Sequence, residues 1–264
     1  MEKLVLIKLG GSVITDKSRQ YVARKGNIAR FAREIKSALK KTNARIIIGH
    51  GAGSFAHVPA HRYKTKEGLI NKNSLFGMSV TEEAARWLNM IVTKEFVSQK
   101  LPVFPFSPAS FLISDAKVCG SSYLDPIKKA LQIGIIPVVY GDVIVDKKIG
   151  CTIFSTERIL SILAGGLQKD YKIRIIYVTN VNGVYDQKGK TIPVITSKNF
   201  KSLRSSIVGA SEVDVTGGML HKVEESLELA KETGIQTVLI NGNKRGNLLR
   251  TIFGREIVST KIKN

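Results

Sequence analysis

The sequence has few of the residues that mark secreted, membrane-spanning or metal-binding proteins. Its 264 residues include only two cysteines, Cys119 and Cys151, which cannot form a disulfide framework and lack the spacing of metal ligands. No apolar run reaches the roughly 18 residues that a membrane helix needs, and the apolar stretch near the N-terminus is too short for a signal peptide. We therefore expect a cytoplasmic protein with no membrane partner.

Acidic residues are also scarce. Asp and Glu together number 21 against 41 Lys and Arg, so the net charge is +20. Such an excess raises the question of nucleic-acid binding. The basic residues are scattered in pairs, however, without the interleaved aromatic residues that a single-strand groove requires. We favour a solvated lysine-rich surface over a field that attracts small anionic substrates, and both over a nucleic-acid partner.

Short apolar runs alternate with helical patterns along the chain, and 43% of the residues are hydrophobic, enough for a large core. Strands are predicted at residues 4–9, 45–49, 102–106, 135–140, 173–178 and 237–240, with a hairpin at 142–145 and 148–154. Helices are predicted at 27–41, 79–100, 125–134, 155–167 and 216–233, with 247–253 and 256–258 closing the chain. The alternation predicts an α/β fold, a mostly parallel sheet with helices on both faces.

A first glycine-rich turn, Gly10-Gly11-Ser12, directly follows the first predicted strand. Adjacent glycines present bare backbone N–H groups to an anion, and Lys8 adds a mobile positive charge. The next residues nearly match a P-loop, but Asp16 stands where its second glycine must be, which excludes that motif.

A second turn, residues 49–57, follows the strand of three isoleucines. Gly51 to Ala56 fits a dinucleotide-binding fingerprint, yet the polar stretch at 64–71 is not the acid-ended strand that the fingerprint requires. We therefore interpret it as a strand-to-helix turn that holds a phosphate or carboxylate. His57 lies on the ligand side of the glycines and His50 on the strand side.

A third turn, Gly217-Gly218, opens the last long helix, with Asp214 or Thr216 as its cap and Lys222 one turn later. Lys8, Lys17 and Lys222 near three glycine turns are typical of phosphoryl transfer, in which the protein positions groups and neutralises charge. The polar loop at 179–186 offers groups for a nucleotide base and ribose.

Four segments together resemble the amino acid kinase superfamily: IKLGGS around Lys8, the GHGAGS turn at Gly49, TNVNGVYD at Thr179 and DVTGGMLHK at Asp214. Their order and spacing fit over almost the whole chain. GGSVITDK followed by HGAGSFAH is similar to the isopentenyl phosphate kinase branch, because of the extra lysine and the second histidine. The fosfomycin kinase branch shares that histidine and remains an alternative, as do other small-acid kinases.

The resemblance implies an open αβα sandwich that forms a single amino acid kinase domain over residues 1–264. The N-terminal lobe, about 1–168, would take isopentenyl phosphate, and the C-terminal lobe, about 169–264, would take ATP with Mg²⁺. It also implies a homodimer, and no metal ligands are expected from the chain.

The resemblance also implies roles for individual residues. The catalytic set is Lys8, Lys17, Lys222 and Glu157. Lys8 and Lys222 would grip the ATP phosphates, Lys17 would stabilise the transferred group, and Glu157 would replace the family's usual aspartate in orienting lysines. Acceptor contacts fall on Ala52, Gly53, His57 and Thr156. ATP contacts fall on Lys8, Gly10, Gly11, Ser12, Gly53, Thr179, Tyr185, Asp186, Gly218 and Lys222.

Two further departures from the family's pattern are Asn182, where Asp is commoner, and Ala52 with Ala56, where glycine is more usual.

The chemistry of the acceptor points the same way. A phosphate monoester has a second pKa near 6, so its oxygen is already a dianionic nucleophile at neutral pH and needs no general base. No candidate base stands beside the glycine turns. The apolar end of the acceptor would need a slot, for which Phe76, Met78, Trp87, Met90 and Ile91 are candidates, or they are ordinary core. The alternatives from other classes are a nucleotide- or nucleic-acid-binding protein without turnover and an NAD-dependent oxidoreductase.

Overall fold

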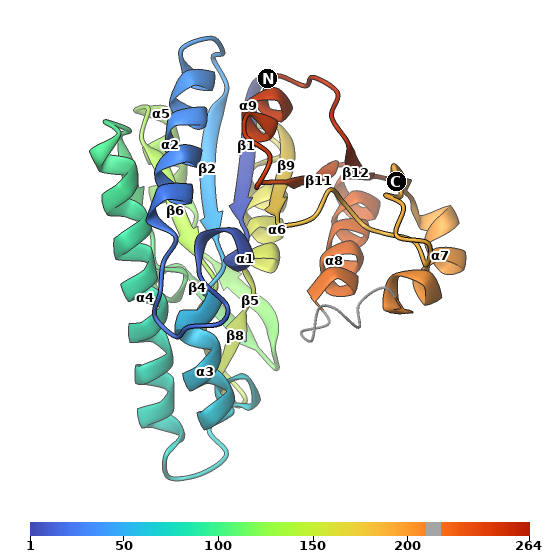
Figure 1. Ribbon diagram of the computed structural model, residues 1–264. Coiled ribbons are helices and arrows are strands. Elements are labelled where there is room, and N and C mark those ends of the chain that lie inside the picture. Colours follow the sequence, from blue (N-terminus) through green and yellow to red (C-terminus); the bar gives the residue numbers. More distant parts are fainter. Residues whose placement is uncertain (210–217) are drawn as a thin grey trace.

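The computed structural model describes residues 1–209 and 218–264, which form a central eight-stranded sheet (Figure 1). Strand β1 (Glu2–Leu9) lies within it, parallel to β2 (Arg45–His50) on one side and β9 (Tyr171–Thr179) on the other. The remaining strands are β3 (Val103–Pro105), β6 (Ile136–Tyr140), β10 (Val194–Ile195), β11 (Thr237–Asn241) and β12 (Ser259–Ile262). Only the β11–β12 pair among these described strands is antiparallel. The predicted mostly parallel α/β sheet is confirmed.

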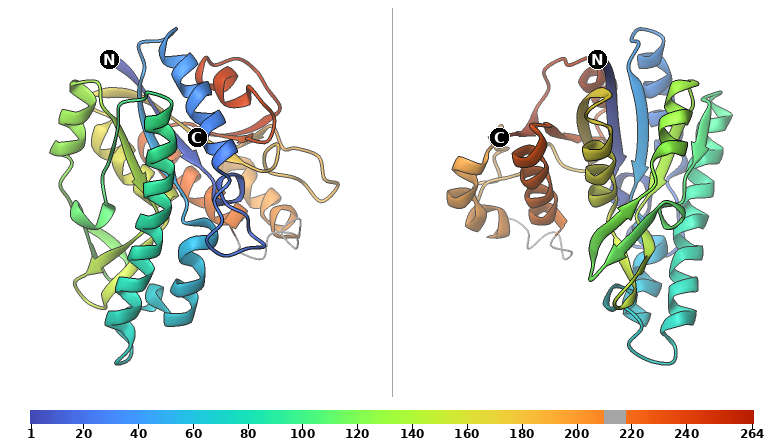
Figure 2. Two further views of the ribbon diagram at one scale, coloured as in Figure 1. Left: turned by 60° about the vertical axis from the view of Figure 1, so that its left-hand side comes forward. Right: turned by 180° about the vertical axis from the view of Figure 1, so that it is seen from behind.

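Helices cover both faces of the sheet, so the strands are hydrophobic on both sides. Along β1, Leu4 and Leu6 point to one core cluster, and Val5 and Ile7 point to the other. The first face carries α5 (Asp125–Gln132), α6 (Thr156–Leu167), α7 (Ser197–Gly209) and α8 (Gly218–Thr233). The second carries α1 (Gly11–Ile14), α2 (Lys25–Leu39), α4 (Ser74–Ser98) and α9 (Asn247–Ile252). Figure 2 shows the same layers in two further views, the right one from behind the view of Figure 1.

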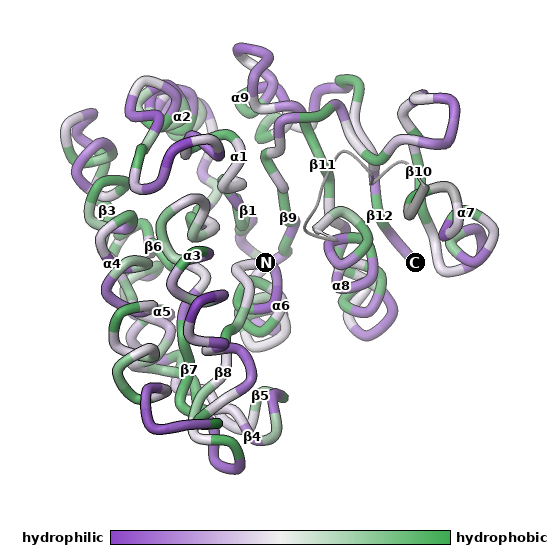
Figure 3. The backbone as a smooth tube through the Cα atoms, turned by 60° about the horizontal axis from the view of Figure 1, so that its bottom comes forward, coloured by the Kyte–Doolittle hydropathy of each residue, from purple (hydrophilic) through white to green (hydrophobic). Residues whose placement is uncertain are grey.

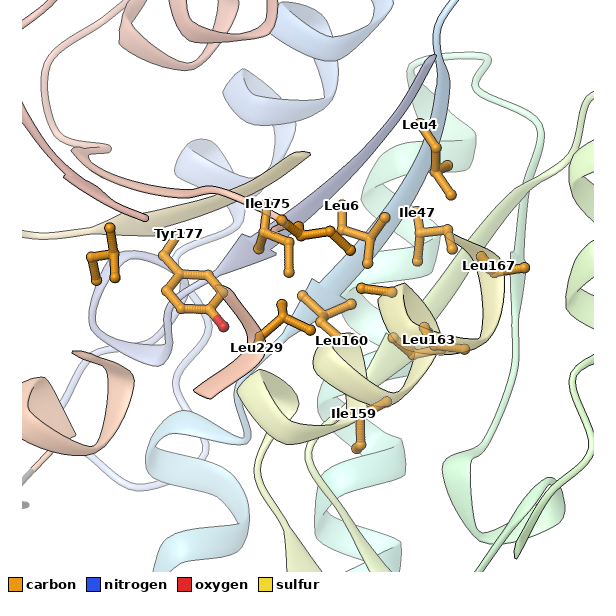
Figure 4. Packing of buried hydrophobic residues seen from close by; sticks show 14 of the residues in the cluster. Leu4, Leu6, Ile47, Ile159, Leu160, Leu163, Leu167, Ile175, Tyr177 and Leu229 are labelled. Carbon is orange, nitrogen blue, oxygen red and sulfur yellow. The ribbon is translucent and has the colours of Figure 1, made fainter. Parts of the chain in front are cut away.

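The alternation along each strand decides which side chains reach which layer. Figure 4 shows Leu6 and Ile175, on neighbouring strands, packed against Leu160 and Leu163 of α6. Lys8 has the same parity as Leu6 and therefore points to the α6 layer. The hydropathy of the backbone follows this arrangement, since β9 and β11 are largely hydrophobic in Figure 3.

A second sheet of four strands extends from the N-terminal half. It contains β4 (Leu112–Asp115), β5 (Val118–Ser122), β7 (Asp142–Asp146) and β8 (Gly150–Phe154), and the short 3₁₀ helix η2 (Pro108–Ser110) precedes it. The β7–β8 hairpin was predicted, whereas β4 and β5 were not.

The long helix α4 packs against α3 (Gly53–Tyr63), with the 3₁₀ helix η1 (Thr65–Glu67) between them. The predicted start of this helix at residue 79 is wrong. Helix α4 begins at Ser74, and the Thr81 hydroxyl inside it donates to the Gly77 carbonyl. Among the helices of the described segments, none combines the length and the apolar character needed to cross a bilayer.

Two predictions concern the C-terminal part of the chain. Residues 256–258 were expected to form the last element, but the closing strand is β12, Ser259–Ile262. The proposed caps of the last long helix, Asp214 and Thr216, lie outside the described residues together with Gly217.

Candidate active site

The loops after the parallel strands gather at one edge of the sheet, because the carboxyl ends of those strands coincide. Leu9 is in register with His50 on β2 and with Val178 on β9. Backbone hydrogen bonds continue past the strand ends, from Gly10 N to Val178 O (2.9 Å) and from Gly51 N to Leu9 O (3.1 Å). The first two glycine turns therefore lie side by side.

The two turns touch through their main chains. A Cβ atom added to Gly11 would lie 2.8 Å from the Gly53 Cα, and one added to Gly10 would lie 2.8 Å from the Val178 carbonyl oxygen. Gly53 has φ +51°, a left-handed conformation that favours glycine. Thr15 joins the turns, since its hydroxyl donates to the Gly11 carbonyl (2.8 Å) and accepts from Ser54 N (3.2 Å). The geometry requires glycine at these positions.

A buried carboxylate holds two of the predicted lysines together. Lys8 Nζ donates to Glu157 Oε1, and Lys222 Nζ lies 3.7 Å from the same oxygen. Glu157 comes from the first turn of α6, whose N-cap Ser155 accepts from Arg158 N. Lys222 stands one turn into α8 and also donates to the Gly218 carbonyl (2.5 Å). Three elements far apart in sequence thus bring one negative and two positive charges to the sheet edge.

The protonation of this cluster follows from burial and mutual attraction. Burial lowers the pKa of Lys8 to about 8, with Lys222 adding to the effect and Glu157 opposing it. Burial alone would raise the pKa of Glu157, but Lys8 and Lys222 outweigh it and hold that pKa at about 2. The carboxylate is therefore charged throughout the neutral range, and Lys8 is mostly protonated at pH 7.

Lys17 lies exposed in the loop between α1 and α2. The carboxylate of Asp16 organises the start of this loop by accepting from Ser18 N (3.0 Å) and from the guanidinium of Arg19 (3.0 Å). The far end is held by Tyr21, which adopts φ +60° and stacks on Trp87 of α4 with 5.1 Å between ring centroids.

The two histidines of the second turn have different surroundings. His50 is fully buried, with its ring nitrogens 3.0 Å from Asn89 Oδ1 and 3.2 Å from the Gly51 carbonyl oxygen. Burial lowers its pKa, which favours the neutral ring. His57 is exposed on α3. Its pKa is lowered mainly because the ring is partly shielded from water, and secondly because of the positive charge of Lys17. The structure thus separates a packed histidine from an accessible one beside the lysines.

Thr156 is buried beneath the second glycine turn. Its hydroxyl donates to the His50 carbonyl (2.7 Å), and its methyl group lies where a Cβ on Gly49 would collide. Ala52 precedes α3 as its N-cap residue and is partly buried. Thr156 therefore supports the turn through the main chain of β2.

The predicted nucleotide loop follows β9, where the Thr179 hydroxyl donates to the carbonyls of Val181 (3.0 Å) and Ile240 (3.1 Å). The Tyr185 hydroxyl accepts from Asn182 N (3.1 Å). The carboxylate of Asp186 accepts from Lys188 N and Lys190 N (2.9 and 2.8 Å). These side chains shape the loop that the sequence predicts as a nucleotide contact.

The five residues proposed for an apolar slot do not line one slot. Phe76 packs against Tyr63 near the start of α4, and Trp87 packs against Phe55 of α3. Phe76 and Ile91 are separated by roughly 22 Å of helix, and Met90 is 61% exposed. Of the five, Phe76 and Trp87 pack against α3, the helix that carries His57.

Several residues that shape the site were not anticipated, namely Thr15, Tyr21 and Asn89. Asn89 gave no signal, since a polar residue on an amphipathic helix is expected on the surface. Ser12, Gly11 and Gly218 lie half-buried at the edge. In residues 1–209 and 218–264, no group of three or more His, Cys, Asp and Glu side chains is arranged to hold a metal ion.

Comparison with known proteins gives a consistent result. The model of the amino acid kinase family matches residues 3–241. The chain is 32% identical to the isopentenyl phosphate kinases of Methanocaldococcus jannaschii and Methanothermobacter thermautotrophicus, in each case over 98% of both chains. A crystal structure of isopentenyl phosphate kinase superimposes with a TM-score of 0.84 at 28% identity, over 98% of this chain and all of the other.

Proposed function

Given that this chain belongs to the amino acid kinase family and is a kinase, we propose that it transfers the γ-phosphoryl group of ATP to isopentenyl phosphate. The observation that carries the proposal is the convergence of Lys8 and Lys222 on Glu157 at the edge where the two glycine turns meet. Relatives that match over almost the full length carry this activity in their names.

The residues at the edge fit the phosphate chain of ATP. Gly10 and Gly11 have no side chains to block an approach to the main chain, and Gly218 offers the N-terminus of α8, where the helix dipole favours an anion. Lys8 and Lys222 would neutralise the phosphate oxygens. Mg²⁺ would arrive bound to those oxygens and supply further charge neutralisation.

The acceptor phosphate would lie on the second turn. The backbone N–H groups of Ala52 and Gly53 lie at the N-terminus of α3. His57 lies one turn farther along the same helix, on its accessible side. The charge of Lys17 contributes to lowering the pKa of His57. Lys17 would stabilise the phosphoryl group while it is transferred. A bound phosphate dianion would raise the pKa of His57 and favour a charge-assisted hydrogen bond.

The chemistry then needs no protein base. An oxygen of the acceptor phosphate attacks the γ-phosphorus, the bond from that phosphorus to the β–γ bridging oxygen breaks, and ADP leaves. The acceptor phosphate is largely a dianion at pH 7, so no proton has to be removed first. The contribution of the chain is positioning and the neutralisation of charge on the transferred group.

The test is ADP formation from Mg-ATP with one acceptor at a time: isopentenyl phosphate, fosfomycin, acetylglutamate or UMP. We expect ADP release that depends on isopentenyl phosphate and its conversion to the diphosphate. Turnover with fosfomycin alone would assign the chain to the other branch. No turnover with any acceptor would favour a nucleotide-binding protein.

His57 variants locate the acceptor. His57→Ala should raise the KM for isopentenyl phosphate strongly and leave the KM for ATP almost unchanged, and His57→Gln should recover part of the loss because its amide also donates. His50→Ala is the matched control, expected to lower the melting temperature instead. A normal acceptor KM in His57→Ala would remove the second glycine turn from the acceptor site.

The quaternary structure is part of the same proposal. Apolar side chains are exposed on α4 and on the edge strand β3, where Met90 is 61%, Val97 55% and Phe104 54% exposed. Covering them with a second copy through the N-terminal lobe, residues 1–168, would leave the C-terminal lobe, 169–264, free to bind ATP. Light scattering should give twice the mass of one chain, and Phe104→Lys should reduce it.

A further inference from the structure

A cavity of about 910 Å³, open to solvent, lies between the start of α2 and the loop that joins β11 to α9. The two helices lie side by side, as the left view of Figure 2 shows. This is the face opposite to the α6 layer, toward which Lys8 points. Apart from glycine and asparagine, the lining consists of one glutamate and four arginines: Glu34, Arg24, Arg30, Arg33 and Arg245. We call it the arginine cavity.

The only acidic residue among those that line the cavity is already neutralised. Glu34 Oε1 accepts from Arg30 Nη1 (3.0 Å) and from Gly246 N (3.1 Å), and Oε2 accepts from Leu249 N (3.1 Å). Arg30 also donates to the Gly242 carbonyl (2.5 Å). This pair therefore ties α2 to the β11–α9 loop, and its charges largely cancel.

The guanidinium groups of the other three arginines are available to bind a ligand. Arg24, Arg33 and Arg245 are exposed, and within the described parts of the chain no hydrogen-bonded or ion-paired partner contacts their guanidinium groups. The N-terminus of the 15-residue helix α2 opens beside them and adds a favourable dipole for an anion.

The composition of the lining restricts the ligand. The lining contains no aliphatic or aromatic side chain, so the cavity lacks an apolar slot for a prenyl chain. Guanidinium groups bind phosphate oxygens in bidentate fashion. We propose that the arginine cavity is a second anion site, which binds a compact polyanion with two or more adjacent phosphate groups, such as a free polyphosphate or the triphosphate chain of a nucleotide.

A ligand there would join two parts of the molecule. Arg24 ends the loop that carries Lys17, and its backbone N donates to the Ile14 carbonyl (2.7 Å). Arg245 belongs to the loop after β11, in which Asn243 N donates to Asn241 Oδ1 (2.9 Å). A polyanion that contacts both arginines therefore links the N-terminal half to the C-terminal half, and we expect it to raise the melting temperature.

The experiment is a calorimetric titration of the full chain with tripolyphosphate, at fixed salt and with the active site saturated by a non-hydrolysable ATP analogue. We expect one further site, which Arg33→Gln with Arg245→Gln weakens about tenfold or more. The matched control is Lys40→Gln with Lys41→Gln, the same change of charge at the other end of α2, which should leave the site intact. Arg33→Lys with Arg245→Lys keeps the charge and should retain part of the affinity.

The outcomes distinguish a nucleotide from a free polyphosphate as the ligand, and they identify the results that contradict the proposal. If more analogue displaces tripolyphosphate, the ligand is a nucleotide; if it does not, the ligand is a free polyphosphate. The arginine variants should keep kcat and both KM values within about twofold, because neither residue belongs to the transfer machinery. Absence of a further site, equal weakening in the lysine control, or preferential binding of RNA would each overturn the proposal.

Discussion

Replacing Glu157 with glutamine should move the pH dependence of the reaction, because it removes the charge that keeps Lys8 protonated. The side chain keeps its size, and only the carboxylate is lost between Lys8 and Lys222. The pKa of Lys8 is about 8 with the carboxylate present, burial being the main cause that lowers it. Loss of a contacting opposite charge lowers a lysine pKa by about 1–3 units. We therefore expect a value of about 5–7 in the variant.

The size of the effect follows from the fraction of Lys8 that carries a proton. At pH 7 a group with a pKa of about 8 is about nine-tenths protonated, whereas one with a pKa of about 5–7 is between about one-hundredth and one-half protonated. If only the ammonium form binds ATP, kcat/KM for ATP at pH 7 falls by about 2- to 100-fold. Between the two pKa values, the ratio of variant to parent falls about tenfold per pH unit.

The assay is kcat/KM for ATP in both proteins from about pH 5.5 to 9. Ionisation of the acceptor phosphate near pH 6 is common to both and cancels in the ratio. Glu225→Gln, a partly buried carboxylate on α8 that does not contact Lys8, is the matched control and should give a flat ratio. A flat ratio for Glu157→Gln as well would refute the reasoning, since Lys8 would then not depend on Glu157 for its proton.

Three further changes test other parts of the structure. Lys17→Met should lower kcat about 100-fold or more with a smaller change in KM, because an interaction made only in the transition state is lost; unchanged kcat would return Lys17 to the solvated surface. Lys222→Ala should raise the KM for ATP, and its acceptor KM serves as the internal reference. Asp142 is buried, and burial raises its pKa to about 7. The folded state therefore binds the extra proton between pH 4 and 7, and stability falls as the pH rises through that range. Asp142→Asn should remove this loss, a gain of as much as about 4 kcal/mol at pH 8 and almost none near pH 4, which melting curves at both pH values would detect.

The strands and turns that were predicted correctly are those whose conformation depends on residues adjacent in the sequence. Three consecutive isoleucines in β2 indicate a strand buried on both faces, and paired glycines indicate a turn wherever they stand. Helix α4 begins five residues before its predicted start, and Gly77, a residue that weakens helix interiors, lies inside it. A Cβ at Gly77 would come within 2.3 Å of the Tyr63 side chain. Close packing of α3 on α4 requires the glycine.

The missed hairpin of β4 and β5 has a different cause. Its residues show little hydrophobic alternation, and its turn is held from outside. The carboxylate of Asp146, on β7, accepts from the backbone N of Ala116 (3.2 Å) and Lys117 (2.7 Å). A local pattern cannot reveal a partner about 30 residues away. The same holds for Lys8 and Glu157, which are 149 residues apart; the resemblance to a family named both, but only the fold brings them into contact.

The contact between Gly11 and Gly53 has a consequence for how such a site can change. The segment expected to hold the donor and the segment expected to hold the acceptor phosphate meet main chain to main chain at Gly11 and Gly53, and the buried Thr15 hydroxyl ties them together. Trp87 on α4 packs against Phe55 of α3 and takes no part in this contact, so in the proposed reaction its replacement would leave the distance over which the phosphoryl group moves unchanged. If the two turns bind the two phosphates as proposed, a change of acceptor at that position would leave the transfer step the same.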